Sequence, residues 1–304
     1  SFMTAVQNPR NFDRVFVSCR RAEYDRLGQN VALTGAVRLL PLEPGQIEKY
    51  LKGRGQCDLW DTISADEQLL ELVRTPLLLR LLSEAIKDAP LIEGEKLNPT
   101  SAAVFDRYIT GRFAREEQKC KQTGNVLALD EAETRRLLSK LAARMWRNPW
   151  IPDTELSFAK ATKVIGQQSR KFLSFACDLG FLSETKLQAF RFIHLKFRDF
   201  CSVPVLIQEL KTNSNRVYSS AQTALIRLGD ATRLVKELHD EDTNTRSLVA
   251  WILGKIGDTL AVPALIETLE DDDELVRQSV VEAIGDIRDG SAVPSLIGAL
   301  GNES

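Results

Sequence analysis

The sequence reads Ala261-Val262-Pro263-Ala264-Leu265-Ile266-Glu267-Thr268-Leu269, and 31 positions later it reads Ala292-Val293-Pro294-Ser295-Leu296-Ile297-Gly298-Ala299-Leu300. Other residues recur with the same offset, for example Asp242 and Asp273. A less regular copy of the pattern precedes both, over residues 229–238. A fixed period of about 20 to 50 residues is typical of a solenoid, in which each unit stacks on the next. The end of the chain is therefore predicted to be a repeat array.

Each repeat unit is predicted to be a pair of helices. Pro263 suits the first turn of the first helix, because the N–H that proline lacks would have no helical partner there. Acidic residues 271–274 precede and enter the second helix, where the helix dipole favours negative charge. Apolar residues then recur at helical spacing and define one buried face: Leu275, Val276, Val280, Ala283, Ile284 and Ile287. These units resemble HEAT repeats and predict an α-solenoid over residues 213–304.

Charge is divided unevenly along the chain. The 304 residues carry a formal net charge of −2, whereas residues 216–304 carry 16 acidic and 8 basic residues, a balance of −8. The remainder therefore carries +6. An acidic solenoid is a poor nucleic-acid binder, and stacked helices suit protein recognition. The repeats are expected to bind a protein partner or ligand. The acidic run itself is interpreted as helix capping and solubility, and a partner surface is the alternative interpretation of that run.

The middle of the chain is predicted to be a winged-helix domain over residues 96–212. The predicted elements are helices near Thr100–Gln118, Asp130–Arg147 and Phe158–Leu179, followed by a hairpin of Phe181–Ser183 with Phe190–Phe192. Its basic residues are Lys160, Lys163, Arg170, Lys171, Lys186, Arg191, Lys196 and Arg198. They are expected to face phosphates or the preceding subdomain. DNA binding, the usual task of isolated winged helices, is the less favoured alternative.

The stretch Phe190-Arg191-Phe192-Ile193-His194-Leu195-Lys196-Phe197-Arg198-Asp199-Phe200 contains one of the two histidines. It predicts a short strand that runs into a helix, with His194 at the junction. The first turn of a helix has unpaired N–H groups and the positive end of the dipole, so anions are favoured there. The histidine adds a donor toward a phosphate. The alternative is a core histidine that is bonded to a backbone carbonyl.

This pattern resembles the Phe-x-Phe-x-His-x-x-Phe-x-x-Phe signature that closes the winged-helix domain of NACHT-type signalling ATPases. The resemblance implies that His194 touches the terminal phosphate of bound ADP and keeps the molecule closed. It also implies a switch, because exchange for ATP frees the winged helix and permits self-oligomerisation, often in defence or signalling.

The first 42 residues are similar to the end of the NACHT nucleotide-binding domain, so residues 1–42 are interpreted as a remnant of an α/β domain. Residues 14–20 predict a buried strand that ends in Ser18-Cys19-Arg20, similar to the sensor-1 strand of that family. The resemblance implies that Arg20 approaches a γ-phosphate; Arg21 follows directly, and which arginine acts is open. An arginine that caps a strand end in solvent is the alternative. Residues 37–42 predict one more edge strand.

Residues 43–95 are predicted to form a small helical subdomain. An amphipathic segment, Gln68–Ala85, contains Arg74-Thr75-Pro76-Leu77-Leu78-Leu79, and the proline is expected to break or kink it. A matching motif in NACHT proteins implies that Pro76 lies against the adenine ring. A simple helix start at Pro76 with leucines in the core is the alternative, and the two are compatible.

No Gly-x-x-x-x-Gly-Lys-Ser/Thr loop is found in the sequence, and two histidines and five scattered cysteines suggest no catalytic set and no metal site. Without a phosphate-binding loop and a metal ligand, phosphoryl transfer loses most of its electrostatic stabilisation. This chain is therefore not expected to be an enzyme or to hold a cofactor by itself. ATP or ADP with Mg²⁺ is expected in an intact parent, whose Walker motifs would lie upstream.

The whole chain is thus predicted to be mainly α-helical and to be a regulatory fragment of a NACHT-type ATPase, with the missing ATPase half of the same protein as a partner. The runner-up is a non-enzymatic adaptor that binds a protein through its HEAT repeats. The sequence has no apolar run of about 20 residues, so no membrane span is expected. The cysteine spacing suggests no disulfide framework, and a cytoplasmic location is expected.

Overall fold

The computed structural model of the chain describes residues 40–92, 96–146, 153–185, 188–211 and 215–294. The chain divides into two units, residues 1–42 and 43–304, and all elements below belong to the second. The strand predicted at residues 14–20 lies outside the described residues. Residues 40–42, which end the predicted edge strand, are described and form no strand, because no described strand pairs with them.

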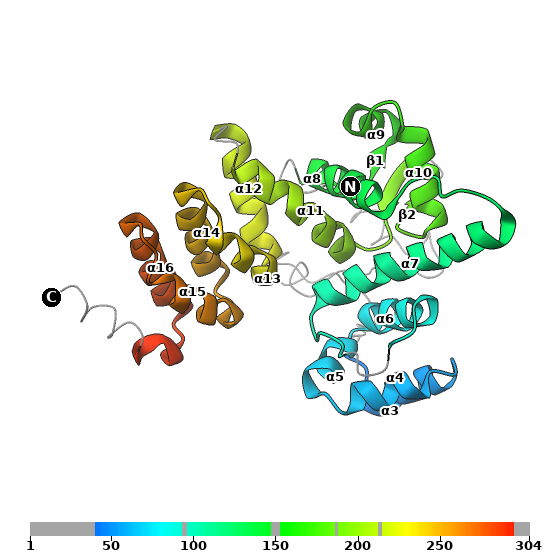
Figure 1. The fold of residues 1–304 in the computed structure, drawn as a ribbon, viewed down its shortest axis with the longest axis horizontal. Coiled ribbons are helices and arrows are strands. Elements are labelled where there is room, and N and C mark those ends of the chain that lie inside the picture. The colour runs from blue at the N-terminus through cyan, green and yellow to red at the C-terminus, as the bar shows by residue number, and fades with distance from the viewer. Residues whose placement is uncertain (1–39, 93–95, 147–152, 186–187, 212–214, 295–304) are drawn as a thin grey trace, which may run out of the picture. The chain divides into compact units, whose positions relative to one another are not determined.

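The described residues from 43 to 92 form four helices: α3 (Pro44–Lys52), α4 (Cys57–Ser64), α5 (Glu67–Val73) and α6 (Pro76–Asp88) (Figure 1). Their starts follow local sequence signals. Asp66 caps α5 by accepting a hydrogen bond from the Leu69 N–H at 3.0 Å. The predicted segment Gln68–Ala85 is interrupted between α5 and α6, and the break that proline was expected to cause is confirmed.

Two longer helices follow, α7 (Ser101–Thr123) and α8 (Glu131–Met145), close to the predicted bounds. Thr100 and Asp130 cap them by accepting hydrogen bonds from backbone N–H groups three residues ahead. Gly111 brings α7 close to α6, because a Cβ built at this glycine would lie 3.0 Å from the Ala85 carbonyl oxygen. Helices α3 to α6 each pack against the next one along the chain, and α6 packs against α7 (Figure 1).

A small antiparallel sheet and two short helices come next. The elements are β1 (Leu156–Ser157), α9 (Phe158–Ile165), α10 (Ser169–Asp178), β2 (Leu182–Glu184) and β3 (Ala189–Phe192), with strand order β1-β3-β2. Leu182 pairs with Phe192, so the predicted hairpin is confirmed. The single helix predicted over Phe158–Leu179 is wrong. It is broken at Gly166, whose φ of +85° is favourable for glycine and lies outside the right-handed helical region.

The core of this region is built from aromatic rings around Phe197, in α11 (Leu195–Leu210). Phe197 is fully buried. Five rings have centroids 5.6–6.4 Å from its own, and they come from α7, β3, α11 and the residues just before β2: Phe105, Tyr108, Phe181, Phe192 and Phe200. The phenylalanines of the strand-and-helix motif are thus core residues that fix α11 against the sheet and α7.

The repeat region consists of helix pairs in the predicted register. Its elements are α12 (Asn215–Leu228), α13 (Ala231–Leu234), η1 (Val235–His239), α14 (Thr243–Ile256), η2 (Thr259–Ala261), α15 (Val262–Thr268), α16 (Glu274–Ile287) and η3 (Gly290–Ala292), the η elements being 3-10 helices. Asp242 and Asp273, which are 31 residues apart, are the N-caps of α14 and α16. Pro263 lies in the first turn of α15. The predicted period, proline position and acidic caps are all confirmed.

Successive elements of the array are joined by ion pairs whose acidic partners, Asp240 and Asp271, occupy equivalent positions. Arg246 of α14 binds both carboxylate oxygens of Asp271, at 2.8 and 2.9 Å, and also donates to the Asp240 carbonyl. Arg246 holds the pKa of the Asp271 carboxyl below its usual value, mainly through this hydrogen bonding. Asp240, the equivalent of Asp271 one unit earlier, is paired with Lys211 at the end of α11. An ion pair through the equivalent aspartate therefore links α11 to the first repeat.

Adjacent second helices of the repeats approach each other closely. A Cβ built on Gly254 in α14 would lie only 2.7 Å from the Cα of Ala283 in α16. The equivalent glycine one repeat later, Gly285, meets nothing within 4 Å among the described residues. Gly254 therefore allows two main chains to meet, and the packing of α14 on α16 depends on the missing side chain.

Candidate functional site

His194 lies at the N-cap of α11, two residues after β3, as the sequence predicted. Its backbone is extended, and its ring nitrogen Nδ1 accepts a hydrogen bond from the Lys196 N–H at 3.1 Å. Because Nδ1 uses its lone pair as an acceptor, the neutral ring carries its proton on Nε2. The side chain is half-buried. The imidazole thus caps α11 and has its N–H donor on the other ring nitrogen.

Pro76 is the first residue of α6 and is exposed. Thr75 before it has extended backbone and makes no side-chain capping bond. Leu78 and Leu79 behind it are buried, so the simple account of a helix start with core leucines holds. Contact with an adenine ring stays a prediction. Arg20 and Arg21 lie outside the described residues, and the structure gives no joint geometry for Arg20, Pro76 and His194.

A contact that the sequence did not predict connects α11 to the first repeat. Pro204 lies inside α11 and has no N–H, so the helix cannot supply the usual donor to the Phe200 carbonyl four residues earlier. Arg233 of α13 supplies it instead, with its Nη1 at 2.6 Å from that oxygen. The guanidinium also lies over the Phe200 ring, 3.7 Å from its centroid. We call these three residues the α11–α13 joint.

Charged groups from two further helices surround the joint. Asp106 of α7 lies 3.9 Å from Arg233 and is bound by Arg135 of α8 at 2.8 Å. Burial lowers the pKa of Arg233 and raises the pKa of Asp230, which caps α13. Burial also raises the pKa of the neighbouring Cys201 thiol to about 12, so this cysteine is an inert core residue. The joint therefore fastens the first repeat to α7, α8 and α11 together.

The second helices of two successive repeats carry one polar face with an exposed aromatic ring. Trp251 and Lys255 on α14 are equivalent to Glu282 and Asp286 on α16, and all four are exposed. Lys255 pairs with Asp286 at 2.7 Å, and its amine lies 5.7 Å from the centroid of the Trp251 ring. We call these four residues the second-helix face. Trp251 leaves 36% of its surface exposed, which makes it the aromatic anchor of this face.

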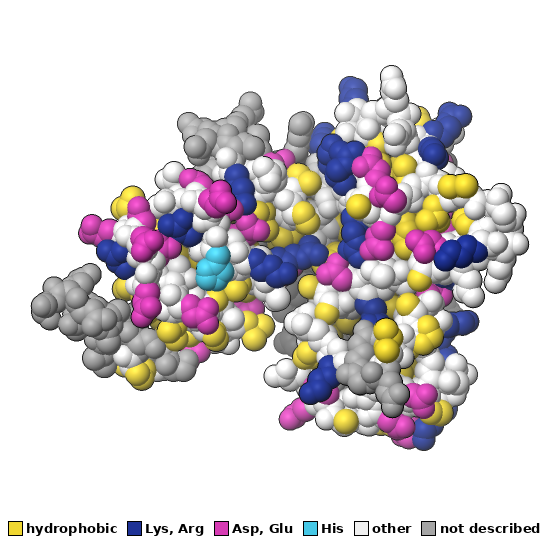
Figure 2. All heavy atoms as spheres, viewed as in Figure 1, with side chains coloured by type: hydrophobic (Ala, Val, Ile, Leu, Met, Phe, Trp, Pro, Cys, Tyr) yellow, Lys and Arg dark blue, Asp and Glu magenta, His cyan; other side chains and the backbone are white. Residues whose placement is uncertain are grey.

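The described residues hold no group of three or more His, Cys, Asp or Glu side chains that is placed to bind a metal ion. Cys57, Cys120, Cys177 and Cys201 are free thiols. None of the described helices combines the length and the apolar character that crossing a bilayer requires. Acidic side chains are spread over the repeats, as the sequence balance predicted (Figure 2).

Comparison with known proteins identifies the repeats. Residues 231–304 match the family model described as HEAT repeats. This match begins at α13, so it bears on the repeats and not on the segments that resemble NACHT proteins. A search of curated proteins found no match.

Proposed function

We propose that this chain is a protein-binding scaffold whose HEAT repeats dock a protein partner on the second-helix face. The family match of residues 231–304 supports this proposal, because HEAT repeats typically mediate protein interactions. The docking surface is placed on this face because the ring of Trp251 is exposed there. The ring lies beside Lys255 on a surface that is built from equivalent positions of two repeats. A large, rigid aromatic ring buries much apolar area at low entropic cost.

The charge around Trp251 indicates which partners fit. Glu282 is exposed and has no ion pair within the described part of the chain, whereas Asp286 is neutralised by Lys255. Residues 216–304 carry a net charge of −8. A partner segment with an apolar side chain for the ring and a basic side chain for Glu282 would therefore complement this face.

The replacement Trp251→Ala is expected to weaken partner binding about 30-fold, the effect of losing about 2 kcal/mol at a hot spot. Peptides selected on the wild-type chain from a random display library would serve as probes, with affinities measured by calorimetry. Leu260→Ala is the matched control, since Leu260 is an exposed apolar residue of the same repeats outside the face. Equal affinity for wild type and Trp251→Ala would refute the assignment of this face.

The finer proposal is that residues 43–212 are the helical and winged-helix part of a NACHT-type nucleotide switch. Helices α8, α9 and α10 followed by the β2–β3 hairpin, an exposed proline at the start of α6 and a histidine at the N-cap of α11 support it. In the longer parent that this resemblance implies, His194 would contact the terminal phosphate of ADP, Pro76 the adenine and Arg20 the γ-phosphate of ATP. The chain itself would hold no cofactor and catalyse nothing.

The proposed phosphate contact would depend on the groups at the start of α11. The helix dipole and the N–H groups of the first turn favour an anion. Nε2–H of His194 is a further donor, fixed in its tautomer by the Lys196 N–H on the opposite nitrogen. Because α11 also carries the joint, a phosphate held at one end of the helix would be connected to the first repeat through Phe200 and Arg233.

The replacement His194→Asp tests the proposed phosphate contact of His194 separately from its role as the N-cap of α11. Aspartate is a good N-cap, so thermal stability should be kept, but its carboxylate repels a phosphate. In the longer parent, release of a fluorescent ADP analogue is expected to become about tenfold faster or more, as for the loss of a charge-assisted hydrogen bond. His239→Asp, at the other and exposed histidine, should release at the wild-type rate. An unchanged rate in His194→Asp would favour the adaptor without a nucleotide switch.

A further inference from the structure

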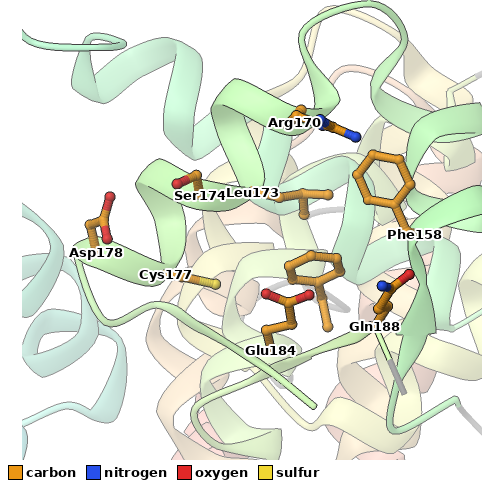
Figure 3. A pocket seen from close by; sticks show the side chains of 9 residues that line it. Phe158, Arg170, Leu173, Ser174, Cys177, Asp178, Glu184 and Gln188 are labelled. Atoms are coloured by element: carbon orange, nitrogen blue, oxygen red, sulfur yellow. The ribbon is translucent and has the colours of Figure 1, made fainter. Parts of the chain in front are cut away.

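A pocket of about 450 Å³ lies between helix α10 and the β2–β3 hairpin (Figure 3). Its walls come from the start of α9, from one side of α10 and from the hairpin. The volume falls within the range of about 300–1,000 Å³ that is usual for small-ligand sites. We call this cavity the α10 pocket.

The floor of the α10 pocket is apolar. Leu173 of α10 and Phe190 of β3 are buried, and the half-buried ring of Phe158 has its centroid 6.4 Å from that of Phe190. The main chain fixes the rim at Gln188, because its carbonyl accepts a hydrogen bond from the Phe158 N–H at 3.2 Å. The pocket therefore offers a ligand an apolar surface that the fold already holds in place.

Opposite charges lie at the two ends of the pocket. Arg170 is the second residue of α10 and Asp178 is the last, and the eight steps between them separate their backbones by about 12 Å along the helix axis. Figure 3 shows Arg170 beside Phe158 at one end and Asp178 at the other. The guanidinium lies 5.9 Å from the centroid of the Phe158 ring. Glu184 of β2 lines the pocket beside Cys177, on the side of Asp178 (Figure 3).

These charges are not neutralised within the described part of the chain. Arg170, Asp178 and Glu184 are exposed, and none of the three forms an ion pair with another described residue. Burial, together with Glu184 and Asp178, raises the pKa of the Cys177 thiol, so the thiol stays neutral between the carboxylates. The pocket thus presents one cation at one end and two anions at the other.

Neutral hydrogen-bonding groups lie between the charged ends. The Ser174 hydroxyl and the Gln188 side-chain amide line the pocket, and neither bonds to another described residue. Each of these groups can both donate and accept a hydrogen bond. A ligand with N–H and C=O groups in its middle, such as a peptide, would satisfy both of them.

We propose that the α10 pocket binds a free peptide of about three residues, with its amino end at Asp178 and Glu184 and its carboxylate at Arg170. An extended chain spans about 3.3–3.6 Å per residue, so about three residues match the distance between the charged ends. Apolar side chains would cover Leu173 and Phe190. Two carboxylates against one guanidinium favour a basic first residue. The pocket shares no residue with the second-helix face or with His194, so it stands or falls independently of the function proposed above.

Titration of the isotope-labelled full chain with the tripeptide Lys-Leu-Leu, followed by backbone amide shifts in nuclear magnetic resonance, tests the pocket. Saturable binding with a Kd below about 1 mM is expected, with shifts at Ser174 and Cys177. The isomer Leu-Leu-Lys has the same composition and charge but places its side-chain cation toward Arg170, so it should bind about fivefold more weakly. Lys-Gly-Gly lacks the apolar side chains and should bind about tenfold more weakly or worse.

Two variants separate the two ends of the pocket. Arg170→Gln is expected to weaken Lys-Leu-Leu about fivefold but to leave the affinity for its C-terminal amide unchanged, because the amide has no carboxylate for Arg170 to bind. Asp178→Asn with Glu184→Gln should weaken both forms about tenfold. Asp61→Asn with Glu117→Gln is the matched control, since it removes the same charge from two exposed carboxylates outside the pocket and should bind as the wild type does.

Three results would overturn the proposal. The first is that the wild type shows no saturable shift with Lys-Leu-Leu up to about 1 mM. The second is that Leu-Leu-Lys binds as tightly as Lys-Leu-Leu, or that the control variant loses as much affinity as the pocket variant. The third is that N-acetylated Lys-Leu-Leu binds as tightly as the free peptide, which would assign the pocket to the C-terminal tail of a protein.

Discussion

Replacing Phe197 with alanine is expected to lower the free energy of unfolding by about 3–5 kcal/mol, because it removes the ring on which the aromatic core converges. Phe197 is fully buried, and rings from α7, β3 and α11 surround it. The lost apolar contacts leave a cavity that five rigid rings cannot fill without leaving their rotamers.

Urea unfolding followed by circular dichroism would measure this loss. Phe158→Ala is the matched control, since Phe158 is half-buried and a single ring, Phe190, lies within 6.4 Å of it among the described aromatic pairs. The control should cost about 1–2 kcal/mol. If the two variants were destabilised equally, Phe197 would not be the centre of this core.

Arg233→Ala is expected to cost about 2–3 kcal/mol, because it leaves the Phe200 carbonyl without a donor and removes the cation from the Phe200 ring. The penalty depends on Pro204, which is the reason that the helix cannot supply the donor itself. In a Pro204→Ala background the new N–H at position 204 can bond to the Phe200 carbonyl. There Arg233→Ala should cost about 1 kcal/mol less.

A double-mutant cycle over Arg233 and Pro204 measures that coupling from four unfolding curves. Arg233→Lys is a useful companion, because it keeps the charge but loses the planar group that lies over the ring. An Arg233→Ala penalty that is the same with and without Pro204 would show that the arginine does not replace the missing helix donor.

The repeat region was predictable because its signals are local and recur. Asp242 and Asp273 cap their helices through N–H groups two or three residues ahead, and Pro263 acts within its own first turn. Such effects depend on neighbours in sequence, and the same local signals recur in two units that are 31 residues apart. The position of His194 at the junction of β3 and α11 was predictable for the same reason.

The predictions that were wrong or missing concern structural features that residues close in sequence do not determine. A single glycine inside a helical pattern costs only about 1 kcal/mol, so residues 158–179 looked continuous although Gly166 ends α9. The joint links Arg233 to a carbonyl 33 residues earlier, and only the fold brings the two together. The exposure of Trp251 and of the charged residues around the α10 pocket likewise depends on which helix faces are covered.

The contact between Gly254 and Ala283 sets the pitch of the array at this step. Because a Cβ on Gly254 would lie only 2.7 Å from the Cα of Ala283, any side chain at position 254 would push α14 and α16 apart. The spacing between Trp251 on α14 and Glu282 on α16 therefore depends on this glycine. A partner that spans both repeats must place its own side chains at the same spacing as Trp251 and Glu282.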